Sequence, residues 1–506
     1  MDDSAHPGTA HHLDVLIVGA GISGIGAAYY LQQEHPGRSY AILEARDACG
    51  GTWDLFRYPG FRSDSDLLTF AYAFKPWRHE DAIASGDKIL DYLRETVTEN
   101  GIDAHIRFHH KVLGAAWSTE TARWTVDVEH GETGELLQFS ANWLFCAGGY
   151  YRYDEGHTPV FEGRERFGGQ VIHPQHWPEE LDYTGKKVVI IGSGATAVTL
   201  VPSMAETAAH VTMLQRSPTY VLPVLRRDHF GTTAQKLLGA RLGYALARRK
   251  NILKQRALFE LLQRFPQTGR RIIRWVNAAK LPDGYPVDEH FQPAYNPWDQ
   301  RLCAVPDGDL YTAISAGTAS VVTDHIETFT ETGIQLASGA HLDADIVVTA
   351  TGLNVQMFGG VALSVDGKPV HLPDTVAYKS MMLTGIPNFV YVFGYTNSSW
   401  TLKVGPICEH FCRLLSYMDS HGYDVVTAEL DDPAMPTKPL LDFGANYVRR
   451  VADQLPRQGV REPYTVSMSY LRDSRRLRHG DVTDSCLRFA RAARVDAFQQ
   501  LNSVVV

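Results

Sequence analysis

Two glycine-rich turns have the residue types and the spacing needed to bind phosphate. Each follows a short, continuous apolar run, which predicts a buried parallel strand, and each precedes a stretch typical of a helix. Such a turn brings backbone N–H groups and a helix N-terminus up to the pyrophosphate of a dinucleotide. The chain therefore predicts two dinucleotide sites. They are Gly19, Gly21 and Gly24 after residues 15–18, and Gly192, Gly194 and Ala197 after residues 188–191.

The residue that ends the next strand distinguishes the two sites. Glu44 ends a strand expected over 40–43, where a carboxylate accepts hydrogen bonds from the ribose of an adenosine without a 2′-phosphate. Arg216 follows a strand expected over 211–214, where a guanidinium pairs with a 2′-phosphate. The first fold therefore suits FAD and the second suits NADPH. Arg216 as a solvated surface charge is the alternative.

Residues 50–64 combine two glycines, Trp53 and a Tyr-Pro-Gly turn. This combination predicts backbone that wraps closely around a large flat ligand, with a surface loop as the alternative. Val112, in a later strand, is expected to edge an adenine. The expected cofactor-binding residues are Gly19, Gly21, Ser23, Gly24, Glu44, Thr52, Trp53, Asp64 and Val112 in the first fold, and Gly192, Ser193, Gly194, Ala195, Thr196, Ala197, Arg216 and Ser217 in the second.

Strands and helices alternate around both turns, which predicts an α/β protein with two Rossmann-like dinucleotide-binding domains. A buried strand over 346–349 marks the expected return of the chain to the first domain. Ser398 or Ser399 is the expected N-cap of a helix over about 401–418, whose start could face the flavin ring. The expected division is a disordered lead-in at 1–12, an FAD-binding domain at 13–149, an NADPH-binding domain at 150–350 with a helical insertion at 222–295, and the rest of the FAD-binding domain with a C-terminal tail at 351–506. We read no chemistry in that tail.

The stretch 226–280 is dense in Lys and Arg, with apolar residues between them at helical spacing. This pattern fits a helical region that binds a membrane surface or a partner protein. It also fits a helical insertion with a solvated basic face, which is the interpretation we favour.

Bulk composition excludes several classes of protein. The 506 residues are 44% hydrophobic and 21% charged, as in ordinary globular proteins, and the net charge of -9 argues against wholesale nucleic-acid binding. Six cysteines in a chain this long do not indicate a disulfide framework. No signal peptide or apolar run of about 20 residues is visible. We expect a cytoplasmic monomer or small homo-oligomer, with loose peripheral membrane attachment only through the basic stretch.

Two longer motifs link these features. They are Phe167-x-Gly169-x3-His173-x3-Trp177-Pro178 and Gly50-Gly51-x-Trp53-x4-Tyr58-Pro59-Gly60-x3-Asp64. Together they resemble the fingerprints of the Baeyer–Villiger monooxygenases, and the similarity extends from about residue 13 to about residue 471. The resemblance implies an enzyme that contains FAD, uses NADPH and O₂, and converts ketones into esters or lactones through a flavin peroxyanion. It also implies oxidation of sulfides and thioamides.

The resemblance also implies catalytic roles by motif position. Arg301 matches the active-site arginine of the family, and Asp64 matches the carboxylate that orients it, here through an expected two-pronged hydrogen bond. A guanidinium keeps its proton at working pH, so it can hold a neighbouring peroxide as an anion and stabilise an oxyanion. Many members have a lysine directly before this arginine that helps to bind the 2′-phosphate. Here that residue is Gln300, which leaves more of the task to Arg216 and Ser217.

His173 and Trp177 invite a catalytic interpretation that we do not adopt. The peroxyanion scheme needs no histidine base, so we interpret His173 as a hydrogen-bonded hinge and Trp177 as a packing anchor. Two other functions stay open. One is a nitrogen- or sulfur-oxidising monooxygenase that acts through the hydroperoxyflavin, and the other is a non-catalytic dinucleotide-binding regulator. The expected partners are O₂ and a small ketone, sulfide or thioamide, without nucleic acid.

Overall fold

Each glycine-rich turn follows a strand that is buried on both faces, in the computed structural model of residues 11–441 and 444–492. Alternate side chains of β1 (His11–Val18) enter two different hydrophobic cores, and those of β9 (Lys187–Ile191) do the same in the second half of the molecule. This explains why both runs are continuously apolar rather than alternating. Val15 and Ile17 lie in one core and Leu16 and Val18 in another, while Val188 and Ile190 are separated in the same way from Val189 and Ile191.

The first sheet contains nine strands in the order β20-β19-β4-β5-β6-β1-β2-β3, with β23 paired to β6. The long strand β6 joins a parallel layer, formed with β1, to an antiparallel meander, formed with β5. Strands from late in the chain complete this sheet, because β19 and β20 extend it beyond β4 and β23 pairs with the end of β6. The bounds are β2 (Tyr40–Leu43), β3 (Ile106–Arg107), β4 (His110–Ser118), β5 (Arg123–His130), β6 (Leu136–Cys146), β19 (Ala362–Val365), β20 (Lys368–Pro369) and β23 (Phe389–Tyr391).

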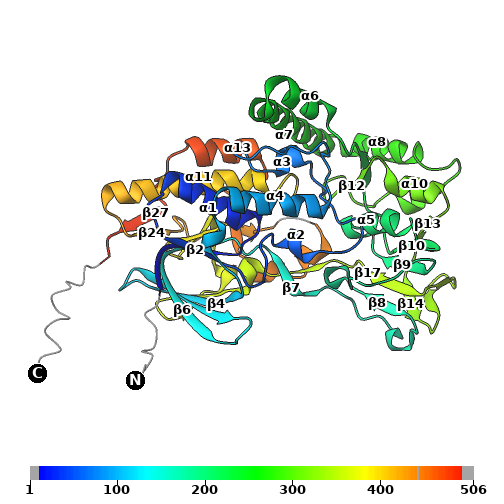
Figure 1. Ribbon diagram of the computed structural model, residues 1–506, viewed down its shortest axis with the longest axis horizontal. Helices are drawn as coiled ribbons and strands as arrows, with labels where there is room; N and C mark the ends of the chain where they lie inside the picture. Colours follow the sequence, from blue (N-terminus) through cyan, green and yellow to red (C-terminus); the bar gives the residue numbers. More distant parts are fainter. Residues whose placement is uncertain (1–10, 442–443, 493–506) are drawn as a thin grey trace, which may run out of the picture.

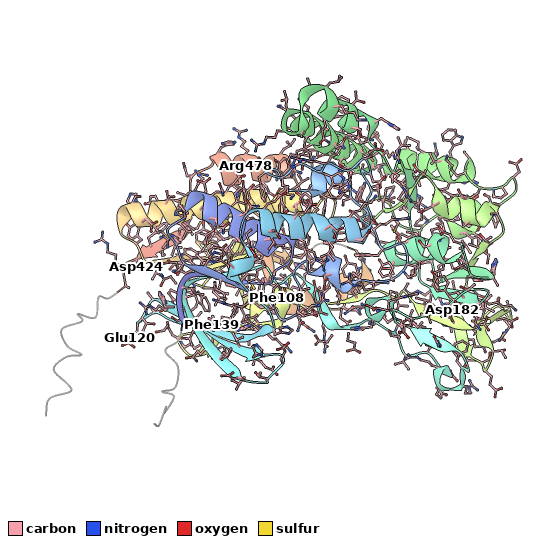
Figure 2. The ribbon with its side chains drawn as sticks, in the orientation of Figure 1. Phe108, Glu120, Phe139, Asp182, Asp424 and Arg478 are labelled. Carbon is pink, nitrogen blue, oxygen red and sulfur yellow. The ribbon has the colours of Figure 1, made fainter. Side chains whose placement is uncertain are left out.

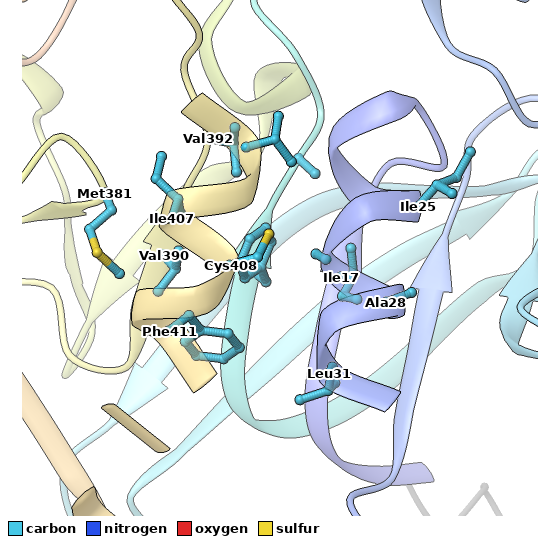
Figure 3. Packing of buried hydrophobic residues seen from close by; sticks show 14 of the residues in the cluster. Ile17, Ile25, Ala28, Leu31, Met381, Val390, Val392, Ile407, Cys408 and Phe411 are labelled. Atoms are coloured by element: carbon cyan, nitrogen blue, oxygen red, sulfur yellow. The ribbon is translucent and has the colours of Figure 1, made fainter. Parts of the chain in front are cut away.

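Two helices lie side by side against the parallel layer of this sheet, although they are far apart in the sequence. Figure 3 shows α1 (Ile22–Glu34) beside α11 (Thr401–His421), with Ile25 and Leu31 on one helix and Phe411 on the other in the same apolar cluster. Fully burying a side chain of this size stabilises the fold by about 1.5–3 kcal/mol. The packing therefore fixes the start of both helices, and both starts face the functional site.

The second sheet is smaller and entirely parallel, with the order β13-β10-β9-β17-β8. Helices α5 (Ala195–Met204) and α10 (Asp309–Ser315) share one core with it, and this half lies on the right of Figure 1. The remaining strands are β8 (Gln170–Ile172), β10 (His210–Gln215), β13 (Ala319–Thr323) and β17 (Ile346–Thr349). Two Rossmann-like halves in one chain confirm the predicted fold class.

A helical insertion leaves the second half, and its helices α6 and α7 lie at the top of Figure 1 with α8 to their right. It consists of α6 (His229–Leu238), α7 (Ala240–Arg264), α8 (Pro266–Ala278) and α9 (Val287–His290). It leads back into β12 (Cys303–Pro306), which pairs in parallel with β11 (Val221–Val224). The insertion thus begins and ends at two neighbouring strands, so that Arg301 lies just before β12.

Positions 1–10 of the expected lead-in lie outside the described residues. Strand β1 begins at His11, two residues before the predicted start, because 11–13 pair with 139–141 of β6. Within residues 11–441 and 444–492, we find no helix that combines the length and the apolar character needed to cross a membrane.

Candidate functional site

A cavity of about 1500 Å³ lies where the two halves meet. Residues of both glycine-rich turns line it, together with Asp64, Arg301 and the segment 445–450. A site for one drug-sized ligand typically occupies roughly 300–1,000 Å³. This cavity is larger, and its walls come from both Rossmann-like halves, so its dimensions suit two large ligands in contact.

The first turn lies where β1 ends and α1 begins, beside the ends of β2 and β6. Gly19 adopts φ +95° and donates its backbone N–H to the Leu43 carbonyl at 2.8 Å, which ties β1 to β2. Gly24 lies behind this turn, where a Cβ atom would come within 1.9 Å of the Gly19 carbonyl oxygen. Helix α1 can therefore approach the turn this closely only because residue 24 is glycine.

Glu44 is buried at the end of β2 and connects that strand to the first turn. Its carboxylate accepts backbone hydrogen bonds from Ala20 at 2.8 Å and from Arg46 at 3.0 Å. Burial raises the pKa of Glu44, and the two N–H donors oppose that rise. A carboxylate has about four acceptor positions, so two remain for the hydroxyls of a ligand in the cavity.

The second turn has the same plan with more open surroundings. Gly192 adopts φ +138° and donates to the Leu214 carbonyl at 2.8 Å, which ties β9 to β10. Ser193 contacts Thr219 through the two side-chain oxygens at 2.8 Å. A Cβ atom on Gly194 would meet no other atom within 4 Å. Arg216 follows β10, exposed and without a carboxylate partner among the residues that the structure describes.

The segment 50–64 joins the two turns. Gly51 packs against the first turn, where its Cβ position lies 3.1 Å from the Cα of Gly21. Gly60 packs against α5 of the second half, where a Cβ would lie 1.9 Å from the hydroxyl of Ser203. Phe56 and Tyr58, between these glycines, are buried in the core of the second half. The interpretation of this segment as a cradle for a flat ligand did not anticipate that it also anchors one half to the other.

Arg301 and Asp64 form an ion pair on the cavity wall, with 2.7 Å between Nη2 and Oδ1. The Asp64 carboxylate raises the pKa of the guanidinium, against the effect of burial. Thr52, Trp53 and Asp64 line the same wall. The structure contains one hydrogen bond between the pair and not the expected two-pronged contact. Within the described part of the chain, the other N–H groups of Arg301 have no hydrogen-bond acceptor and are available to a ligand.

Aromatic side chains that the sequence analysis missed surround Arg301. The hydroxyls of Tyr150 and Tyr151 are 2.5 Å apart, and Tyr150 stacks on Trp400 with ring centroids 5.2 Å apart. Burial raises the pKa of Tyr150, Tyr151 and Tyr447, so these hydroxyls stay neutral at ordinary pH. Tyr150 and Tyr151 directly follow the small residues that end the first block, and aromatic residues at a domain junction are a usable signal. Tyr447 had no such signal, because it belongs to the tail in which we read no chemistry.

His173 occupies the junction between the two connecting strands. Strand β7 (Tyr151–Gly156) pairs antiparallel with β18 (Leu353–Val355), so the outgoing and returning connections lie together. Nδ1 of His173 accepts the Gln175 backbone N–H at 3.2 Å, so Nε2 carries the proton and donates to the Gly352 carbonyl at 3.1 Å. Burial lowers the pKa of His173. Both ring nitrogens are thus engaged in structural bonds and neither faces a reaction centre.

The structure brings most of the predicted cofactor residues together, with two exceptions. Gly24 and Ala197 lie behind the cavity wall and do not line it, because each sits where its helix packs against its strand. The predicted N-cap is also wrong. Helix α11 begins after Trp400, while the Ser399 hydroxyl bonds that of Thr69 at 2.7 Å. The residues singled out from the sequence that do line the cavity are Gly19, Gly21, Ser23, Glu44, Thr52, Trp53, Asp64, Val112, Gly192, Ser193, Gly194, Ala195, Thr196, Arg216, Ser217, Gln300 and Arg301.

Comparisons with known proteins agree with this geometry. Residues 79–361 match the flavin-binding monooxygenase-like family, and residues 17–79 match an NAD(P)-binding Rossmann-like domain. The chain is 52% identical to the FAD-containing monooxygenase EthA of Mycobacterium tuberculosis H37Rv, covering 95% of this chain and 98% of that protein. It is 48% identical to the putative FAD-containing monooxygenase MymA of the same strain, covering 96% and 98%. A solved oxidised steroid monooxygenase bound to NADP shares the fold, with a TM-score of 0.75, 22% identity, and coverage of 95% of this chain and 100% of that one.

Proposed function

The chain belongs to the flavin-binding monooxygenase-like family, and we propose that it is a Baeyer–Villiger monooxygenase that converts ketones into esters or lactones. It uses FAD, NADPH and O₂, and it accepts sulfides or thioamides as further substrates. The observation that supports this reaction is the Arg301–Asp64 pair, which lies on the wall of the cavity shared by both dinucleotide turns.

The residues present fit both cofactors. Helices α1 and α5 begin at Gly21 and Gly194 without a side-chain cap, so their first N–H groups are left for phosphate. The open space beside Gly194 lies where the second pyrophosphate would approach. Glu44 would hold the ribose of FAD, and Arg216 with Ser217 would hold the 2′-phosphate of NADPH. When bound, the flavin reduced by NADPH supplies the electrons that activate O₂.

Arg301 contributes a permanent positive charge and several N–H donors. That charge disfavours protonation of negatively charged oxygen beside it, and the donors stabilise the oxyanion that develops when the ketone carbonyl is attacked. Asp64 orients the guanidinium through one hydrogen bond, which leaves donors for the substrate. The neutral rings of Tyr150, Tyr151 and Tyr447 line the same wall, and the low polarity they provide strengthens the field of Arg301.

Replacement of Arg301 tests this proposal. In Arg301→Ala we expect NADPH to reduce the flavin at the normal rate, while ester formation from a ketone falls by about 10²–10³. Stopped-flow absorbance measures the first step, and gas chromatography of products measures the second. Arg57→Ala is the matched control, since Arg57 lies in the same motif, pairs with Asp54 and does not line the cavity.

Substrate pairs separate this proposal from its alternative. A matched ketone and sulfide are offered to the wild-type enzyme and to Arg301→Ala. Ester from the ketone supports the Baeyer–Villiger reaction. Sulfoxide without any ester would identify a sulfur-oxidising monooxygenase, and an unchanged ester yield in Arg301→Ala would remove the role of Arg301.

A further inference from the structure

The outer surface of the helical insertion is apolar as well as basic. Twelve of the seventeen exposed large hydrophobic side chains in the described part of the chain fall within 225–275, about a tenth of the sequence. Monomeric proteins rarely gather exposed apolar side chains in this way without a partner. They are Leu225, Phe230, Leu237, Leu238, Leu242, Leu246, Leu253, Leu258, Leu261, Phe265, Ile272 and Trp275. We call this set, with the exposed cations between its members, the insertion face.

Three members of the insertion face form a stripe of their own on the first half of α7, whereas Leu258 and Leu261, farther along, point to other sides of the helix. At 3.6 residues per turn, Leu242, Leu246 and Leu253 fall within about 40° of one another around the helix axis. These three side chains are between 42% and 55% exposed. The buried residues Tyr244 and Asn251 lie on the opposite side of the helix. The helix therefore carries one apolar stripe beyond the face it needs for packing.

The inner face of α7 holds this orientation. One guanidinium nitrogen of Arg248 donates to the carbonyls of Leu68, Thr69 and Ala71 at 2.6–3.1 Å. The Tyr244 hydroxyl donates to the Tyr72 carbonyl at 2.9 Å. These bonds fasten the helix to the segment that follows Asp64, so the helix cannot rotate to bury its leucines. Figure 2 shows the side chains of α6 and α7 projecting away from the body of the molecule.

The charge of the same region is opposite to that of the whole chain. Residues 225–275 contain 13 Lys and Arg but only 2 Asp and Glu, whereas the complete chain has a net charge of -9. Six exposed cations there have no carboxylate partner among the residues that the structure describes. They are Lys236, Arg241, Arg249, Lys254, Arg264 and Arg271. Long basic side chains beside exposed leucines can reach phosphate while their stems and the leucines enter an apolar layer.

We propose that the insertion face docks on a lipid bilayer that contains anionic lipids. Two other occupants match the surface less well. A second copy placed face to face would bring the six unpaired cations of each chain together without carboxylates to neutralise them. A nucleic acid would pair its phosphates with the cations, but it would leave the exposed leucines of α7 in contact with water. The proposal is independent of the reaction proposed above, because none of its residues lines the cavity.

Vesicle co-sedimentation of the FAD-loaded enzyme tests the proposal. We expect binding to vesicles of equal parts phosphatidylglycerol and phosphatidylcholine that is at least tenfold tighter than binding to phosphatidylcholine alone. Added salt should weaken this binding, since a charge-dependent contact is screened. Two triple variants, L242Q/L246Q/L253Q and R241Q/R249Q/K254Q, should each lose at least tenfold in vesicle affinity and keep NADPH oxidation in solution. L136Q/R123Q, on an exposed part of the first sheet, should bind vesicles like the wild type.

Several outcomes would overturn the proposal. One is wild-type enzyme that stays in the supernatant with anionic vesicles, and another is triple variants that sediment like the wild type. A dimer in size-exclusion chromatography that dissociates in the leucine variant, without vesicle binding, would identify the face as an interface between copies. Release from vesicles by a short DNA duplex at equal phosphate concentration would identify a nucleic-acid surface. If a triple variant loses its FAD, the two vesicle types and the salt titration of the wild type still decide.

Discussion

The two dinucleotide turns share one plan but differ in how tightly the protein surrounds them. Around the first, Gly24 brings α1 into contact with the turn, Gly51 packs against Gly21, and Glu44 is buried beside them. Around the second, Gly194 has open space and Arg216 is exposed. Position 24 corresponds to Ala197 in the second turn, where the helix leaves room for a methyl group.

We infer that this difference separates a cofactor that stays from one that exchanges. An enclosed first turn suits FAD, which remains bound through many turnovers. An open second turn suits NADPH, which must enter and leave in every cycle, and an exposed Arg216 can release a phosphate to solvent. Substitutions at Gly24, Arg216, Gly156 and His173 test this contrast.

Gly24→Ala should have the largest effect. Its methyl group would lie 1.9 Å from the Gly19 carbonyl oxygen, so α1 must move away from the turn. Overpacking of this kind destabilises by about 1–3 kcal/mol, and the displaced turn should leave the purified protein nearly free of FAD. Flavin absorbance per mole of protein and the thermal midpoint measure the result. Ala197→Gly is the matched change in the second turn and should retain FAD; equal FAD loss in both would contradict the contrast.

We expect Arg216→Gln to weaken the binding of NADPH and to leave the binding of FAD unchanged. A hydrogen bond to a charged group contributes about 1.5–3 kcal/mol, which corresponds to a rise in KM for NADPH of roughly 10- to 150-fold. KM for NADH should stay constant, because NADH lacks the 2′-phosphate. Lys186→Gln, another exposed cation of the second half, serves as control. An unchanged KM for NADPH would favour Arg216 as a solvated surface charge.

Gly156→Ala should disturb the hinge and not the binding of FAD. A methyl group there would lie 1.9 Å from Cε1 of His173 and would push the ring away from the Gly352 carbonyl. Loss of that hydrogen bond should slow NADPH-dependent turnover by about two- to tenfold. Steady-state kinetics and flavin content measure both effects. Gly37→Ala, which meets no atom within 4 Å, should behave like the wild type. Loss of FAD together with turnover would show that the hinge also holds the first turn.

The smallest expected effect is a pH dependence of the thermal stability that arises from His173. Because burial lowers the pKa of His173 below the ordinary value of 6.5, the unfolded chain binds more protons there than the folded chain does. The contribution of neutral His173 to the free energy of unfolding is complete above pH 6.5, and it is lost as the pH falls below that value. The thermal midpoint of the wild type should therefore decrease more steeply between about pH 7.5 and 5.5 than that of His173→Gln. Parallel curves would mean that folding does not lower the pKa of His173.

Local patterns predicted much of the fold. The strand expected over 40–43 appears as β2, and the stretch after the first glycine turn, which is typical of a helix, appears as α1 (Ile22–Glu34). These elements follow from apolar runs and glycine turns within a few residues of each other, so neighbouring side chains suffice to specify them. The family resemblance identified Arg301 and Asp64 by their position, and the structure places the two in contact over a separation of 237 residues.

Other features depend on contacts that no local pattern contains. Tyr447 reaches the cavity from a tail in which we read no chemistry, and Phe56, from the segment 50–64 of the first half, is buried in the core of the second half. The sequence did not predict that leucines of α7 are exposed, for a related reason. Apolar residues at helical spacing predict an amphipathic helix, but the spacing cannot tell which of two apolar stripes the protein covers.

Residue types and their spacing are enough to establish two dinucleotide turns, an acid after one and an arginine after the other, and motifs that resemble those of the Baeyer–Villiger monooxygenases. These depend on residue type and short spacing, which the covalent chain preserves in any conformation. The folded chain was needed to show how closely each turn is enclosed, which aromatic rings surround Arg301, and that the insertion is apolar on its outer side. Those properties arise from packing between distant segments, and packing exists only once the chain has folded.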